Sequence, residues 1–201
     1  DEEVTLFNKY CIPGFSIRGG SEYNVLERFH EVVMEFQPDL IIRATADNPF
    51  VSMELLNYGI GKFKEENYDY FIKKGYPLGT HPEFISKYAF LKTYADSFQP
   101  YHYEHVTPYI YENPAKFSII NETTLEYSKI KDLRLTFDVE EDYNVLDFIA
   151  SKFNYKYNIS LNEIKELYFI DKKNMKTNSE IIQKSYNQVE EDVYSNYNRT
   201  R

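Results

Sequence analysis

Two aspartates that close short apolar stretches are the residues of this chain best suited to metal chemistry. Asp47 ends the stretch 40–47, which starts with three aliphatic residues, and Asp138 ends the alternating segment 132–138. Ligands of open α/β sheets bind beyond the carboxyl ends of the strands, and a divalent cation on phosphates takes one or two carboxylates. The pair therefore predicts a magnesium-phosphate site, while an aspartate before an Asn-Pro pair is equally typical of a turn.

Three other polar groups allow both a functional and a structural interpretation. Asp142 is either an acidic neighbour of Asp138 or charge in the first turn of the following helix, which the helix dipole favours. The segment 18–21, with two glycines before a predicted helix, is either an anion-binding turn or a plain turn. His102 and His105 contribute to a polar substrate cluster, or are structural, or share a zinc ion, for which no further ligand lies at a recognisable spacing.

The elements that would position these groups alternate between helix and strand. Apolar residues at helical spacing predict helices over 4–10, 21–37, 52–66, 87–95, 104–111 and 140–153. Short apolar or alternating runs predict strands over 15–17, 39–45, 68–72, 83–85, 117–120 and 132–138. Ser21 and Ser52 are the predicted N-caps of the second and third helices. The order strand, helix, strand over 15–45 is typical of a parallel βαβ unit.

These elements predict one α/β domain over residues 1–155 and a helical extension over residues 156–201. Two helical stretches with a weaker apolar stripe are expected in the extension. Its apolar stripe would pack on the domain or on a partner subunit, so a homodimer is one expected assembly.

Composition limits the compartment and the partners of the protein. The 201 residues are 42% hydrophobic and 17% aromatic, which is enough for one sizeable core. A net charge of −9 argues against nucleic acid and anionic membranes as partners, because both need a positive surface. No apolar run approaches about 20 residues, no signal peptide is recognisable, and the single Cys11 has no disulfide partner, so we expect a cytoplasmic protein. Without a Gly-x-Ser-x-Gly pattern or a histidine near Cys11, covalent catalysis is not expected.

Five segments, taken in order, carry a resemblance to a known family. They are 18–22 with 24–28, 42–49, 76–79 with Glu83, 104–109, and 133–138 with Glu141 and Asp142. Their order and spacing cover most of residues 10–150. The chain resembles the cytidylyltransferases that activate sugars, in the branch called spore coat polysaccharide biosynthesis protein F-like, which is related to the acylneuraminate and 3-deoxy-manno-octulosonate cytidylyltransferases.

The resemblance implies a fold, a reaction and a set of site residues. The fold is the Rossmann-like nucleotide-diphospho-sugar transferase fold, with a mixed, mostly parallel sheet flanked by helices. The reaction is the transfer of CMP from CTP to a hydroxyl of a sugar or sugar acid, with release of pyrophosphate, in surface or spore-coat polysaccharide biosynthesis. Asp47 and Asp138 match the family's magnesium ligands and would be the catalytic residues. The other matching positions are Arg18, Ser21 and Thr45 for the nucleotide, and Glu83, Glu104, His105 and Arg134 for the sugar.

The sequence also departs from the family pattern. Members of the family begin with a strand and an Ala-Arg-x-x-Ser-x-Arg-Leu-Pro-Gly-Lys loop that binds the CTP phosphates, and residues 1–201 contain no such loop. Either the chain is part of a longer protein, or it is a family member that has lost this loop. The second case predicts a non-catalytic or regulatory protein that binds a sugar or a protein partner without turnover.

Overall fold

The computed structural model describes residues 14–182, which form two compact units. The first unit contains residues 14–39 and 87–117, and the second contains residues 40–86 and 118–182. The helix predicted over 4–10 and the last helical stretch of the predicted extension lie outside the described residues. No helix among residues 14–182 is both long and apolar enough to cross a bilayer.

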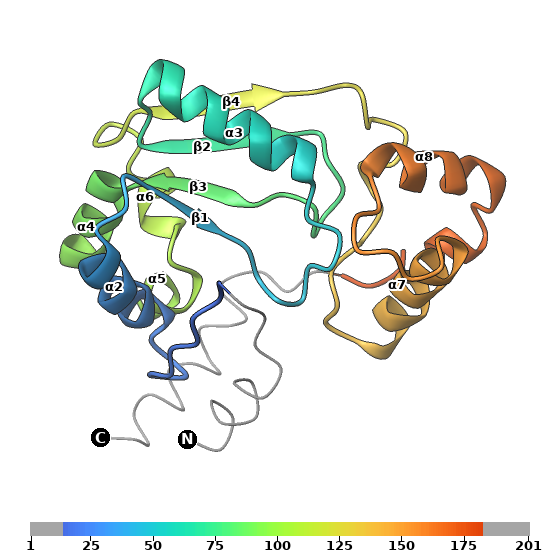
Figure 1. The fold of residues 1–201 in the computed structure, drawn as a ribbon, viewed down its shortest axis with the longest axis horizontal. Coiled ribbons are helices and arrows are strands. Elements are labelled where there is room, and N and C mark those ends of the chain that lie inside the picture. The colour runs from blue at the N-terminus through green and yellow to red at the C-terminus, as the bar shows by residue number, and fades with distance from the viewer. Residues whose placement is uncertain (1–13, 183–201) are drawn as a thin grey trace. The chain divides into compact units, whose positions relative to one another are not determined.

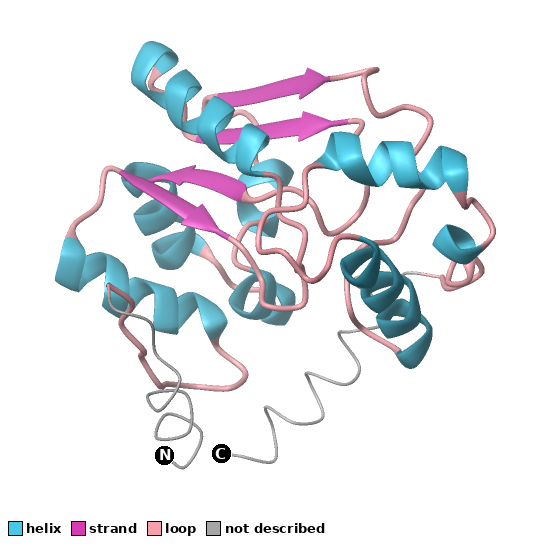
Figure 2. Cartoon of the chain, turned by 45° about the vertical axis from the view of Figure 1, so that its right-hand side comes forward, coloured by secondary structure: helices cyan, strands magenta, loops and turns pink. Residues whose placement is uncertain are grey.

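A four-stranded mixed sheet forms the centre of the second unit. Its order is β1 (Leu40–Arg43), β3 (Glu83–Ser86), β2 (Tyr70–Lys74) and β4 (Ile119–Thr123). β3 is antiparallel to both of its neighbours, whereas β2 and β4 are parallel, so three of the four strands run in one direction (Figure 2). The mixed, mostly parallel sheet predicted from the sequence is confirmed.

Helix α3 (Met53–Glu66) packs on this sheet (Figure 1). Its sequence supplies an N-cap that starts the helix and a glycine that lets it approach β3 closely. The hydroxyl of Ser52 accepts the amide of Leu55, as predicted for an N-cap. A Cβ on Gly59 would lie 2.3 Å from the ring of Phe84 in β3, so a glycine is needed at this contact.

Two further helices complete the second unit. α7 (Glu140–Lys152) and α8 (Leu161–Ile170) are followed by a short 3-10 helix, η1 (Asn174–Lys176). Apolar residues of α7, α8 and η1 belong to the same core as the sheet: Val145, Leu146, Ile149, Leu161, Ile164, Leu167, Tyr168 and Met175. A boundary between independent domains near residue 155 stays a prediction.

The first unit is helical in its described part. α2 (Val25–Phe36) packs against α4 (Lys87–Asp96) and α5 (Pro100–His105), and α6 (Pro108–Glu112) follows. The predicted N-cap at Ser21 is wrong, because Asn24 caps α2 with its side-chain oxygen.

Two more local predictions are wrong for identifiable reasons. Residues 15–17 form no strand, so the predicted βαβ unit is absent from the described chain. The helix predicted over 104–111 is interrupted at Val106, whose φ of 71° no helix accommodates. Pro108 lies in the first turn of α6, where its missing N–H has no consequence.

The segment 132–138 is extended at its centre but is not a strand. Leu133 and Leu135 exchange backbone hydrogen bonds with Leu78, at 3.2 and 3.0 Å, so the segment pairs with a loop. This approach needs Gly79, which has φ +84° and whose Cβ would meet the carbonyl of Leu135 at 2.5 Å. The predicted alternation fails because residues 133–136 are all buried, whereas Phe137 is 50% exposed.

Candidate functional site

Asp47 lies in the loop beyond the carboxyl end of β1. Thr45 shapes this loop, because its carbonyl accepts the amide of Asn48 at 3.1 Å and its hydroxyl accepts the Asn48 side-chain amide at 2.7 Å. The backbone around Asp47 therefore forms the turn that the Asn-Pro pair predicts. Its side chain has an additional property: Oδ1 is buried and receives no hydrogen bond from the residues the structure describes, and the same holds for Asn48 Oδ1.

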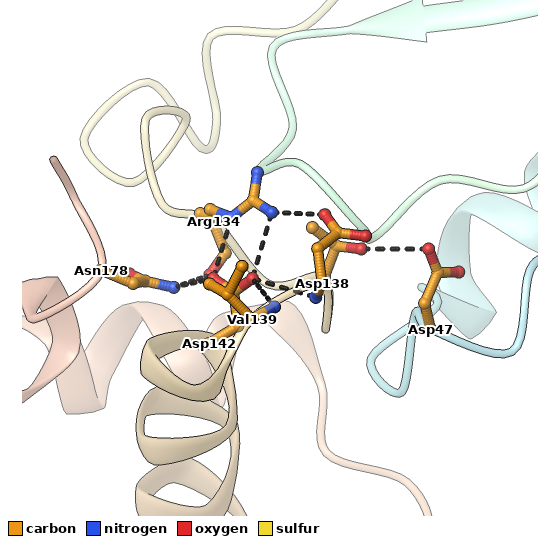
Figure 3. Close-up of polar contacts among 7 residues, drawn as sticks. Asp47, Arg134, Asp138, Val139, Asp142 and Asn178 are labelled. Carbon is orange, nitrogen blue, oxygen red and sulfur yellow. Dashed lines mark hydrogen bonds and ion pairs between the residues drawn. The ribbon is translucent and has the colours of Figure 1, made fainter. Parts of the chain in front are cut away.

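Asp138 belongs to the segment that contacts the Asp47 loop. The amide of Phe137 donates to the carbonyl of Asp47 at 2.8 Å, and the Thr136 hydroxyl donates to Asp47 Oδ2 at 3.3 Å. These contacts place the side chain of Asp138 on the segment next to the Asp47 loop (Figure 3). The structure thus brings the two predicted aspartates to the same edge of the second unit, 91 positions apart in the sequence.

The Asp138 carboxylate is held from one side and open on the other. Its Oδ2 forms an ion pair with Arg134, and its side chain is 41% exposed. Oδ1 is the carboxylate oxygen that lies outside the contact with Arg134 Nη2. Together with Asp47 Oδ1, this oxygen is the group of the site that could take a cation.

Arg134 and Asp142 form a buried ion pair beneath Asp138. Arg134 Nε donates to Asp142 Oδ1 at 2.8 Å, and its Nη2 donates to Asp142 Oδ2 at 3.0 Å. Asp142 is 0% exposed and also accepts the backbone amides of Asp138 and Val139, at 3.0 and 3.2 Å. The side-chain amide of Asn178 also donates a hydrogen bond to Asp142 Oδ1, at 2.8 Å. Asp142 is therefore a fixed anchor for Arg134 and for the backbone at Asp138.

These contacts shift the pKa values of both partners. Burial alone would raise the pKa of Asp142, but hydrogen bonds from Arg134, the Asp138 amide and Asn178 outweigh it and hold that pKa below its usual range. Burial alone would lower the pKa of Arg134, yet its two carboxylate partners raise it overall. Both groups are therefore charged near neutral pH.

The lowered pKa of Asp142 predicts an acid-sensitive second unit. A carboxylate whose folded-state pKa is depressed adds stability above its unfolded-state pKa of about 3.9, and this stability is lost as the pH falls from there through the folded-state value. The free energy of unfolding, measured by urea denaturation at pH 4.5, 3.5 and 2.5, should fall over this window. In Asp142→Asn the fall should be smaller, and an equal fall would contradict the assignment.

The remaining predicted site residues of the second unit have structural partners. Glu83, at the start of β3, forms an ion pair with Arg43 of β1 at 2.5 Å and accepts the Tyr70 hydroxyl at 2.9 Å. Arg134, predicted to contact the sugar, has its guanidinium engaged by two carboxylates. Thr45 lies two residues before Asp47 in the same loop.

Four predicted site residues belong to the first unit. Arg18 forms an exposed ion pair with Glu35 of α2, and the hydrogen bonds from Arg18 to that carboxylate raise its guanidinium pKa. The hydroxyl of Ser21 accepts the Asn24 amide at 3.0 Å. Glu104 and His105 end α5, and Glu104 Oε2 is buried without a hydrogen bond from the described residues.

The side chains of the site that could bind a metal fit magnesium better than zinc. Within residues 14–182 no group of three or more His, Cys, Asp or Glu side chains is arranged to hold a metal. His102 is buried and its Nε2 contacts Glu112 at 3.0 Å, which gives it a structural role. Asp47 Oδ1 and the exposed Asp138 carboxylate offer hard oxygen atoms on two side chains, as expected for a cation that also binds substrate phosphates and water.

The sequence places Asp142 in the first turn of the helix that follows Asp138, where it lies, but it does not indicate the burial of Asp142 or the role of Asn178. Asp142 was expected as helix charge or as an acidic neighbour, and its burial against Arg134 follows from contacts that no local pattern shows. Asn178 was placed in a weakly amphipathic extension, and a single asparagine there carries no signal that it binds residues 36 and 44 positions away.

The fold and the site define an α/β protein with two acidic side chains at the carboxyl edge of its sheet. Comparison with known proteins identifies the family to which this α/β protein belongs. The family model described as Cytidylyltransferase matches residues 1–193. The chain therefore belongs to the cytidylyltransferase family and is a nucleotidyltransferase.

Two curated proteins and one solved structure are similar to the chain. An uncharacterized protein of Methanocaldococcus jannaschii is 36% identical over 182 residues, which are 89% of this chain and 73% of that protein. Spore coat polysaccharide biosynthesis protein SpsF of Bacillus subtilis is 32% identical over 165 residues, 81% of this chain and 69% of that protein. The structure of a cytidylyltransferase from Leptospira borgpetersenii matches with a TM-score of 0.79 at 23% identity, over 91% of this chain and 76% of that one. This match confirms the predicted fold.

Proposed function

We propose that the protein transfers CMP from CTP to a hydroxyl of a sugar or sugar acid and releases pyrophosphate, in a magnesium-dependent reaction of polysaccharide biosynthesis. Family membership and the relative named for spore coat polysaccharide biosynthesis support the reaction and its setting. The single structural observation that carries the magnesium dependence is the buried Asp47 Oδ1 without a hydrogen-bond donor, on the loop next to Asp138. A buried carboxylate oxygen is costly unless a cation or a donor satisfies it.

Asp47 and Asp138 would hold the magnesium ion. When bound, the ion would neutralise charge on the triphosphate and favour departure of pyrophosphate. The reaction forms a bond from the sugar oxygen to the α-phosphorus, breaks the bond from that phosphorus to the bridging oxygen of pyrophosphate, and releases the hydroxyl proton to solvent. Thr136 holds Asp47 Oδ2, so Oδ1 stays directed away from that contact. Arg134 holds Asp138 Oδ2 in the same way, so the chain supplies two preset oxygens rather than a nucleophile.

The contacts to nucleotide and sugar remain part of the proposal. Arg18, Ser21 and Thr45 are assigned to the nucleotide, and Glu83, Glu104 and His105 to the sugar, from the resemblance to the family. We assign Arg134 to the positioning of Asp138 instead of the sugar, because two carboxylates already occupy its guanidinium. The cytoplasmic location and the homodimer stay predictions.

Pyrophosphate release tests the proposed function. The protein, including any residues that precede Asp1 in its gene, is incubated with CTP, magnesium and a panel of sugars and sugar acids. We expect release that depends on one sugar class, is slower with ATP, GTP or UTP, and stops with a chelator. Absence of release and of magnesium-dependent CTP binding would refute the proposal, and sugar binding without release would favour the non-catalytic alternative.

A further inference from the structure

Asn178 joins the C-terminal part of the second unit to the segment that carries Asp138. Its side-chain amide donates one hydrogen bond to the carbonyl of Arg134 at 3.0 Å and another to Asp142 Oδ1 at 2.8 Å (Figure 3). The residue is 1% exposed, so neither bond competes with bulk water. Both donors of this side chain are therefore used on one segment.

The contacts of Asn178 continue to the backbone of the site. The Asp142 carboxylate that Asn178 binds accepts the amides of Asp138 and Val139, and it also fixes the guanidinium that pairs with Asp138. A shift of Asp142 would consequently move Asp138 through two routes, one through the backbone and one through Arg134. The position of a proposed metal ligand thus depends on a residue 40 positions further along the chain.

The chain around Asn178 is itself fixed. Met175, in η1, is 0% exposed within the core, and η1 packs against α7, the helix that begins two residues after Asp138. The carbonyl of Asn178 accepts the amide of Ile181 at 3.2 Å. A neutral amide suits the position, because a second cation beside Asp142 would compete with Arg134, and an apolar side chain would deprive the Arg134 carbonyl and Asp142 Oδ1 of a donor.

We infer that Asn178 is a positioning residue of the Asp47 and Asp138 site. The consequence for catalysis rests on the proposed function, whereas the consequence for the backbone at Asp138 does not. Partners that orient a metal ligand typically change metal affinity by about 10- to 100-fold when they are removed.

The test compares Asn178→Leu, which keeps the approximate size and removes both donors, with two controls. Asn174→Ala removes an asparagine of the same segment whose side-chain amide donates to Asp171, and Ile164→Val shortens a core residue of α8. Hydrogen exchange of the Asp138 and Val139 amides, Mn²⁺ binding in the presence of CTP, and the thermal midpoint are measured for each protein. Asn178→Gln serves as a second variant if Asn178→Leu does not fold.

We expect Asn178→Leu to exchange the Asp138 and Val139 amides about tenfold faster and to bind Mn²⁺ about tenfold more weakly, whereas the controls change neither by more than about twofold. Unchanged exchange of these two amides in Asn178→Leu would overturn the inference. Equal effects in Ile164→Val would also overturn it, because the cause would then be lost core stability. If the unmodified protein binds no Mn²⁺ with CTP, the proposed function fails, and the exchange rates still decide the role of Asn178.

Discussion

Replacing Asp47 by asparagine is expected to abolish CMP transfer while leaving the second unit folded. The substitution removes the charge of a buried oxygen that no described residue satisfies, and with it one of the two preset ligands for magnesium. Loss of one preorganised electrostatic group costs about 100- to 1,000-fold in turnover. The structural contribution of the carboxylate is one 3.3 Å bond from Thr136, which asparagine can still accept, so stability should change by less than about 1 kcal/mol.

Turnover and thermal unfolding, measured on the same preparation, check this expectation. Asp132→Asn is the matched control, because Asp132 is an exposed aspartate of the same unit. It should retain full activity. Turnover of Asp47→Asn within tenfold of the unmodified protein would contradict the ligand role, and a large loss of stability would show that Asp47 acts through the fold.

Replacing Arg134 by methionine is expected to destabilise the second unit by about 3–5 kcal/mol. The change leaves Asp142 buried at 0% exposure without its cation, and removing one partner of a buried pair has about this cost. Asp138 loses its ion pair at the same time. Urea denaturation gives the free energy of unfolding, and a loss below about 1 kcal/mol would mean that the pair is solvated in solution.

The double variant Arg134→Met with Asp142→Leu separates stability from function. Replacing both members of a buried pair by apolar residues of similar size is often neutral, so part of the lost stability should return, although the Asp138, Val139 and Asn178 amides lose their acceptor. Transfer should stay impaired, because the backbone amides of Asp138 and Val139 lose their acceptor and Asp138 loses Arg134. Recovery of both stability and turnover would show that this network only supports the fold.

The sequence predicts the elements with strong local signals. The N-cap at Ser52 and the apolar period of α3 locate that helix to within a residue, and the same holds for α7. Prediction fails where distant contacts decide the structure. Leu133 and Leu135 alternate like a strand, yet their backbone partners are provided by Leu78 through the close approach at Gly79.

The two aspartates of the candidate site could be selected from the sequence, whereas the residues that hold them in place could not. Asp47 and Asp138 each follow an apolar stretch, so the rule for strand ends and the family resemblance select them. The burial of the pair between Arg134 and Asp142 depends on tertiary contacts with Asn178 and on the position of α7. No periodicity encodes such contacts, and only the folded chain brings them together.

The most direct test of the account is the position of the cation. A crystal of the protein with Mn²⁺ and CTP gives an anomalous signal that locates the metal independently of activity. The account predicts one peak at about 2.1 Å from carboxylate oxygens of both Asp47 and Asp138, with triphosphate oxygens as further ligands. A metal bound to the triphosphate alone, with both aspartates outside coordination distance, would contradict it.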